Sequence, residues 1–290
     1  MKPNMKIFDS MKEIFDFRRF GKYFVADIKG CTANYGLSLL LISLSGVMVY
    51  LMNAAIALLT RGHWSSLPEE IRFAVFCMAA IVLVVSMPVK CYGSVTDKRS
   101  GSAFILLPAS TFEKYLSMLI NCIIIIPGLF TAAYLSLDWL LTVLDPAIES
   151  TTSEVFGKLF SLISEGSREL AELSLDSLQI NPFSGIDDTI TMIMVFLLGA
   201  LCFKSGKTVK TILSLIIVGI GVSLVISPIA VHWFSTHFAG LNLESMNSAE
   251  AVELFKGTFR SLTILDTILD ITVLAGLFIV TFLRLKTIKH

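Results

Sequence analysis

Long apolar blocks separated by polar segments dominate the pattern of this chain. A helix needs about 20 residues to cross a hydrocarbon core about 30 Å thick, and blocks of this kind indicate membrane-spanning helices. The block at 187–203 is the weakest, because its purely apolar part begins only at Ile190. The pattern predicts an all-α, multi-pass membrane protein with six transmembrane helices within 36–290. The six blocks are 36–59, 71–89, 115–137, 187–203, 211–234 and 261–283.

The segment 1–35 does not have the pattern of a spanning helix. Phe8, Met11 and Phe15 recur at helical spacing, and a cluster of basic residues follows them. Basic, aromatic and amphipathic segments tend to lie in the plane of the lipid headgroups. We therefore expect a cytoplasmic tail with an interfacial elbow helix, and a solvated tail is the alternative. The segment is too charged to resemble a cleavable signal peptide.

Two of the connecting segments are long enough to have structure of their own. The inner loop 90–114 is the larger inner connection, and the outer loop 138–186 is acidic. Apolar residues recur at helical spacing in the outer loop, which predicts an amphipathic helix interrupted near Gly166. This helix is expected to pack on the outer surface or cap the bundle, and a lid is the alternative.

Charge patterning sets the expected orientation. The chain is 54% hydrophobic, with a mean hydropathy of +0.77 and a formal net charge of zero. With the N-terminus in the cytoplasm, 17 of the 23 basic residues fall on the inner side, and 17 of the 23 acidic residues fall on the outer side or in the outer half of a helix. Lys and Arg favour the cytoplasmic side. The sequence therefore predicts an N-in, C-in protein of the cell (cytoplasmic) membrane, surrounded by lipid and without a nucleic-acid partner.

Motifs for enzymatic chemistry are weak or missing. The stretch SGKT at 205–208 resembles the end of a phosphate-binding loop, but Leu201 stands where the motif requires its first glycine. The sequence contains no His-Glu-x-x-His pattern. The cysteines lack metal-ligand spacing and are expected to be small apolar packing residues. We expect no enzymatic activity, cofactor or metal in this chain. The cysteines are Cys31, Cys77, Cys91, Cys122 and Cys202.

The inner loop ends in a strong local signal for a helix start. Ser110 and Glu113 form a Ser-x-x-Glu capping box, which places the first helical residue at Thr111. Pro108 keeps the preceding residue extended. The pattern predicts an ordered loop held against the inner membrane face, and an ordinary well-capped re-entry into the membrane is the alternative.

The stretch DKRSGSAFILLPASTFEKYLSML, at 97–119, resembles the segment before the third span in permease subunits of type-2 ABC exporters. In those subunits a basic and a small residue precede a Leu-Pro-x-Ser-x-x-Glu-Lys-like sequence. The basic elbow, the six spans, the N-in and C-in termini and the missing nucleotide site are also similar to that family. One departure is that the large outer loop here follows the third span rather than the fifth. The matching residues are Lys98, Arg99, Gly101, Leu107, Pro108, Ser110, Glu113 and Lys114.

The resemblance implies that the loop 90–114 contains a coupling helix that docks on a separate cytoplasmic ATP-binding cassette ATPase. It also implies that two copies of the chain, or a related pair, form the transport pathway. The residues expected at the docking site are Asp97, Lys98, Arg99, Phe104, Leu107, Pro108 and Glu113.

Two acidic residues occupy the last apolar block. Asp266 and Asp270 are four residues apart and share one helix face. Asp270 is expected roughly 9 Å inside the outer boundary. An aspartate at a helix centre costs about 2.5–3.5 kcal/mol to insert, so these residues are candidates for a transport pathway. The alternatives are that Asp270 pairs with Arg260 or a polar neighbour, or is protonated.

Three functions follow from these patterns. The first is the permease subunit of an ABC exporter, driven by a separate ATPase. The second is a membrane scaffold or sensor that does not transport. The third is an ion-coupled carrier that uses Asp270 as its coupling carboxylate.

Overall fold

The computed structural model describes residues 15–61, 67–97, 101, 104, 106–145, 152–155, 157, 184–238 and 248–288. Within these ranges, side chains are not described at 61, 184–186, 230, 233, 234, 237, 238 and 248–266. The regular structure of the described residues is helical, and they contain no strand. The prediction of an all-α protein is confirmed for this part of the chain.

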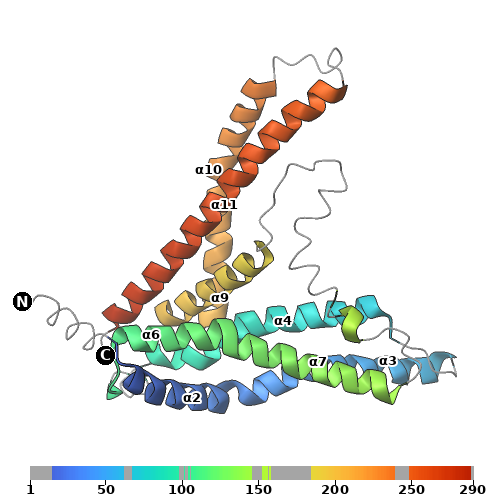
Figure 1. The fold of residues 1–290 in the computed structure, drawn as a ribbon, viewed down its shortest axis with the longest axis vertical. Coiled ribbons are helices and arrows are strands. Elements are labelled where there is room, and N and C mark those ends of the chain that lie inside the picture. The colour runs from blue at the N-terminus through green and yellow to red at the C-terminus, as the bar shows by residue number, and fades with distance from the viewer. Residues whose placement is uncertain are drawn as a thin grey trace, which may run out of the picture.

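The helices form a bundle from which the last two long helices diverge (Figure 1). The first five helices are α2 (Phe17–Ser43), α3 (Ser45–Arg61), α4 (Glu69–Tyr92), α6 (Thr111–Ile120) and α7 (Ile126–Leu144). The last three are α9 (Ser184–Cys202), α10 (Lys207–Phe238) and α11 (Ser248–Thr287). Two short elements, the 3₁₀ helix η1 (Gly93–Thr96) and the π-helical turn η2 (Asn121–Ile125), lie at the ends of α4 and α6.

Five helical stretches in the described residues are long and apolar enough to cross a membrane. Together they indicate a multi-pass membrane protein. Helix α9, which corresponds to the predicted block 187–203, is not among the five. It has 19 residues and begins with the largely polar sequence SGIDDT. The five stretches are Phe17–Thr60, Glu69–Thr96, Thr111–Leu144, Lys207–Ile229 and Thr267–Thr287.

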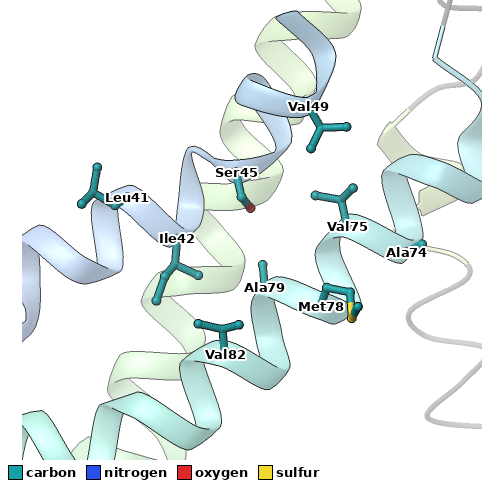
Figure 2. Close-up of a pocket in the computed structure, with 9 residues that line it drawn as sticks. All are labelled: Leu41, Ile42, Ser45, Val49, Ala74, Val75, Met78, Ala79 and Val82. Atoms are coloured by element: carbon teal, nitrogen blue, oxygen red, sulfur yellow. The ribbon is translucent and has the colours of Figure 1, made fainter. Parts of the chain in front are cut away.

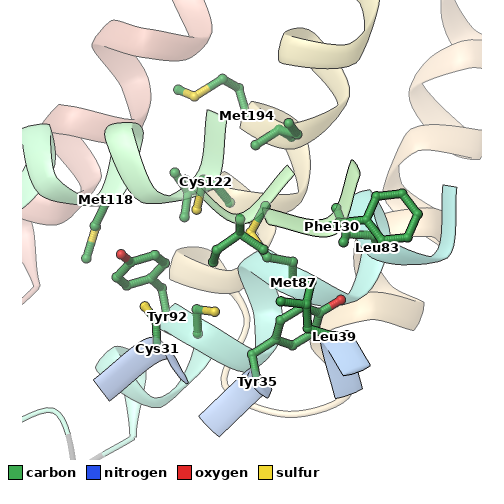
Figure 3. Close-up of a cluster of buried hydrophobic side chains, with 14 of the residues drawn as sticks. Cys31, Tyr35, Leu39, Leu83, Met87, Tyr92, Met118, Cys122, Phe130 and Met194 are labelled. Carbon is green, nitrogen blue, oxygen red and sulfur yellow. The ribbon is translucent and has the colours of Figure 1, made fainter. Parts of the chain in front are cut away.

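Helix α9 lies at the centre of the packing. Ile193, Met194, Leu197 and Leu201 are almost completely buried in the main core cluster. Helices α4, α10 and α11 contact α9. Figure 3 shows this core, in which side chains from several helices converge. An apolar helix enclosed by other helices cannot be distinguished by composition from one that faces lipid.

Helices α2 and α3 form one nearly continuous run. Asp16 caps α2 by accepting a hydrogen bond from the Arg18 N–H group at 2.9 Å. The helix then passes position 36 without interruption and changes direction only at Leu44. Residues 17–35 and the first apolar block therefore belong to the same helix. The elbow helix remains a prediction, because most of its amphipathic stripe lies outside the described residues.

The predicted third span is interrupted by a π-helical turn. Pro127 lies in the first turn of α7, directly after η2. A proline has no N–H group and its ring clashes with the carbonyl of residue i−4, so the preceding turn must widen. Proline thus explains why this span divides into α6, η2 and α7.

Helices α10 and α11 leave the bundle at the end where α9 and α10 meet (Figure 1). Thr211 is buried, whereas the described side chains from 216 to 236 are exposed. Gly199 on α9 allows close approach, because any Cβ at this position would overlap Thr211 Oγ1. The contact between Gly199 and Thr211 therefore fixes where α10 departs from α9.

Candidate functional site

The predicted capping box is present at the start of α6. The Ser110 hydroxyl accepts a hydrogen bond from the Glu113 N–H group at 3.2 Å. The Glu113 carboxylate accepts one from the Ser110 N–H group at 2.8 Å. Helix α6 begins at Thr111. The predicted helix start is confirmed.

Glu113 also binds the beginning of α2. Arg19 donates from Nε to Glu113 Oε2 at 2.9 Å and from Nη2 to Oε1 at 2.8 Å. The Asp16 N–H group donates to Oε1 at 2.9 Å. A two-point guanidinium–carboxylate pair is strong and fixes orientation. Since Glu113 is 0% exposed, it holds the inner loop against α2 and offers no surface for a partner to touch.

Lys114 fixes the other side of the same segment. Its ammonium group donates to the Phe104 carbonyl oxygen at 2.7 Å and lies 5.0 Å from the centroid of the Phe104 ring. The side chain of Lys114 is buried. Burying an ammonium group is costly unless it is hydrogen-bonded, and the carbonyl and the aromatic face offset part of this cost. Phe104, which packs against the core, is therefore held in place.

Next to these buried contacts the end of the bundle that holds the start of α2 exposes an apolar surface. Leu106 is 81% exposed and Phe17 is 82% exposed. The Phe15 ring lies 4.8 Å from that of Phe17 and 6.2 Å from that of Phe112, so aromatic contacts connect α2 with α6. We call the exposed residues the apolar end surface. Its members are Phe17, Leu106, Leu107, Pro108 and Phe112.

Asp97 joins the inner loop to the connection between α9 and α10. Lys207 lies 3.3 Å from the Asp97 carboxylate and also donates to the Gly93 carbonyl. The Thr96 hydroxyl donates to the Phe203 carbonyl at 3.4 Å. Lys207, the lysine of the SGKT stretch, is thus engaged in contacts between helices. Lys98 and Arg99, which were predicted to belong to the docking site, lie outside the described residues.

Helix α11 carries the two candidate pathway residues. Both belong to a helix of 40 residues that runs from Ser248 to Thr287. The Asp270 side chain is exposed, whereas the Asp266 side chain lies outside the described residues. The structure therefore places Asp270 on a helical stretch that is long and apolar enough to cross a membrane.

A buried polar cluster near the same end of the bundle was not expected from the sequence. Asp27 Oδ2 accepts hydrogen bonds from the Ser117 hydroxyl, from the Tyr92 hydroxyl at 3.0 Å and from Asn121 Nδ2 at 2.9 Å. Asn121 Nδ2 also donates to the Tyr92 hydroxyl at 3.0 Å. These contacts join α2, α4 and α6. The available signal was the four-residue spacing of Ser117 and Asn121, which places two polar side chains on one helix face.

A second buried polar cluster lies towards the opposite end of the bundle. Arg72 on α4 and Asp138 on α7 form a two-point ion pair, with Arg72 Nε 3.0 Å from Asp138 Oδ1. Their exposed fractions are 6% and 7%. Thr152, in the predicted outer loop, donates to Asp138 Oδ2 at 2.9 Å. Val155, from the same loop, is almost fully buried. This part of the loop therefore packs on the bundle. The predicted amphipathic helix interrupted near Gly166 lies outside the described residues and stays a prediction.

These clusters connect helices and contain no arrangement that suggests catalysis. Within the described ranges, no group of three His, Cys, Asp or Glu residues could hold a metal ion. The cysteines at 31, 91 and 122 are buried in the core, as expected of small packing residues. Comparisons of the chain with models of known protein families, with curated proteins and with solved structures gave no match.

Proposed function

We propose that this chain is the transmembrane permease subunit of an ATP-binding-cassette exporter. In this proposal a separate cytoplasmic ATPase docks on the loop 90–114. The observation that carries the proposal is the exposure of Leu106 and Leu107 directly beside the buried anchors Glu113 and Lys114. The resemblance of this segment to the coupling region of type-2 exporter permeases agrees with it.

A docking segment must combine an accessible surface with a rigid attachment. Exposed apolar side chains outside the lipid-facing spans favour a protein partner. The Arg19–Glu113 pair and the Lys114–Phe104 contact attach this surface to α2 and to the core. A movement imposed on Leu106 and Leu107 would therefore be transmitted to the helices, which a flexible loop would not do.

The proposed topology has six spans, with α9 as the fourth and both termini in the cytoplasm. The end of α11 lies at the same end of the bundle as the start of α2 (Figure 1). Consistent with this, Arg284 Nε donates to the Leu201 carbonyl at 3.2 Å. An even number of crossings follows if both ends lie on one side. In this arrangement the basic ends of α2, α10 and α11 face the cytoplasm, as positive charges prefer.

The pathway in this proposal forms between two membrane subunits, either two copies or a related pair. Helix α10 supports this, because its described side chains beyond 216 contact little of the bundle. Asp270 is the pathway candidate, since an acidic residue in a membrane-spanning helix normally faces a partner or a wet cavity.

Replacing Leu106 and Leu107 by aspartate tests the docking surface. We expect at least a ~10-fold loss of the ATPase that co-purifies with a C-terminally tagged chain extracted in mild detergent. Burial of a leucine side chain contributes about 1.5–3 kcal/mol, and each 1.4 kcal/mol is a factor of ten. Mass spectrometry identifies the co-purified subunit, and its ATP hydrolysis is measured directly.

Leu144→Asp is the matched control. Leu144 is also well exposed, but it is the last residue of α7 and lies far along the chain from the proposed docking loop. It should retain the ATPase. The intact protein isolated without any ATP-binding subunit, under conditions that preserve comparable complexes, would contradict the proposal. The proposal would also be contradicted if the variant with aspartate at positions 106 and 107 recovered as much ATPase as the unchanged chain.

A further inference from the structure

An apolar groove runs between the α2–α3 run and α4. Its volume is about 530 Å³. Figure 2 shows the lining side chains, which come from both helical runs on either side of the direction change at Leu44. The polar atom among them, the Ser45 hydroxyl oxygen, is itself buried. The lining residues are Leu41, Ile42, Ser45, Val49, Ala74, Val75, Met78, Ala79 and Val82.

A positive charge stands at the inner end of this groove. Val82, Ser86 and Lys90 are spaced four residues apart on α4 and share one helix face. The Lys90 ammonium donates to the Ser38 hydroxyl on α2 at 2.6 Å. Ser38 precedes the lining residue Leu41 by three residues, which is a rise of about 4.5 Å. The ammonium group therefore lies within one helical turn of the apolar groove.

Lys90 is available to an anionic ligand. Its side chain is exposed, and within the described ranges it forms no ion pair with a carboxylate. The lysine lies in the last turn of α4, near the end of the membrane-spanning stretch Glu69–Thr96. Lipid phosphates are found at this level, and lysine binds phosphate as a point charge.

We propose that the groove binds one acyl chain of an anionic phospholipid whose phosphate contacts Lys90 and Ser38. A volume of about 530 Å³ lies in the usual range for small ligands, about 300–1,000 Å³. The apolar length with a cation at one end matches the chemistry of a phospholipid. This inference requires no ATPase partner and stands independently of the proposed function.

The test measures lipid binding to the purified full-length chain in detergent, by native mass spectrometry and by thermal unfolding. Phosphatidylglycerol and phosphatidylcholine are titrated separately, and inorganic phosphate is added in a third series. We expect phosphatidylglycerol to bind about five-fold more tightly than phosphatidylcholine. Inorganic phosphate should leave the unfolding temperature unchanged, because it cannot occupy the groove.

Two variants at exposed positions test separately the contact of the lipid headgroup with Lys90 and the contact of the acyl chain with the groove. Lys90→Gln should lower phosphatidylglycerol binding to the level of phosphatidylcholine. Met78→Trp should fill the groove and weaken the binding of both lipids. Lys29→Gln, at another exposed lysine near the inner end, is the matched control and should bind as the unchanged chain does. Because Met78 and Lys90 are exposed, both variants are expected to fold.

Three results would overturn the inference. The first is an unchanged preference for phosphatidylglycerol in Lys90→Gln together with unchanged lipid binding in Met78→Trp. The second is stabilisation by inorganic phosphate equal to that by the lipid. The third is a change from dimer to monomer in Met78→Trp without a change in bound lipid, which would assign the groove to a second copy of the chain.

Discussion

Replacing Asp138 by asparagine is expected to destabilise the protein by about 3–5 kcal/mol, because it leaves the Arg72 charge buried without its carboxylate. Both side chains are more than nine-tenths buried, and they contact each other at two points. Equilibrium unfolding in mixed detergent micelles measures the loss. Asp188→Asn, at an exposed acidic position on α9, should change the unfolding free energy by less than about 0.5 kcal/mol.

The double variant Arg72→Met with Asp138→Leu distinguishes the charge from the packing. Replacing both members of a buried ion pair by apolar residues is often neutral, whereas removing one member is costly. We therefore expect the double variant to be more stable than Asp138→Asn. A loss below about 1 kcal/mol in Asp138→Asn would show that Arg72 finds another partner or water, and would contradict this account.

We also expect Asp138→Asn to loosen the attachment of the outer loop to the bundle. Thr152 donates to Asp138, so part of the loop is anchored on the ion pair. Asp138→Asn leaves the Arg72 charge without its carboxylate and so weakens the site to which Thr152 is attached. We therefore expect added protease to cleave the loop faster in this variant. This follows from the general rule that segments open locally when their few buried contacts are lost.

Much of the helical structure could be predicted from the sequence. An apolar block that is long enough to cross a membrane has few stable structures other than a helix. The start of α6 was also predictable, since a capping box is a local interaction between Ser110 and Glu113. The burial of α9 was not, because lipid and a protein core are equally apolar surroundings for a helix. Periodicity likewise did not show that α2 continues from the charged segment into the first apolar block.

The candidate site also contains features that the sequence could predict and features that it could not. The exposed leucines and the capping box come from one stretch of sequence, whereas the partner of Glu113 is Arg19, 94 residues earlier. The cluster around Asp27 depends on which faces of α2, α4 and α6 meet. Hydrophobic periodicity identifies the buried face of one helix but not the helix that covers it. Contacts between distant polar residues were therefore outside the reach of sequence patterns.

Replacing Gly199 by alanine is expected to separate α9 from α10. A Cβ at this position would overlap Thr211 Oγ1 and lie 2.8 Å from Thr211 Cγ2. Thr211 cannot easily move, because it is β-branched and its hydroxyl donates to the Lys207 carbonyl at 2.7 Å. Overpacking of this kind costs about 1–3 kcal/mol. Unfolding in mixed micelles should show this loss.

Two further variants determine whether the loss comes from this contact. Gly219→Ala on α10 meets no atom within 4 Å and should be neutral or stabilising, since alanine favours a helix by about 1 kcal/mol over glycine. Adding Thr211→Ala to Gly199→Ala removes the two nearest atoms and leaves the Cβ of residue 211 at 2.9 Å. The double variant should therefore recover part of the stability, giving a favourable coupling energy. Equal stability of the two glycine variants would show that α9 and α10 do not need this close approach. Recovery in the double variant would instead establish it as the point that fixes how α10 leaves the bundle.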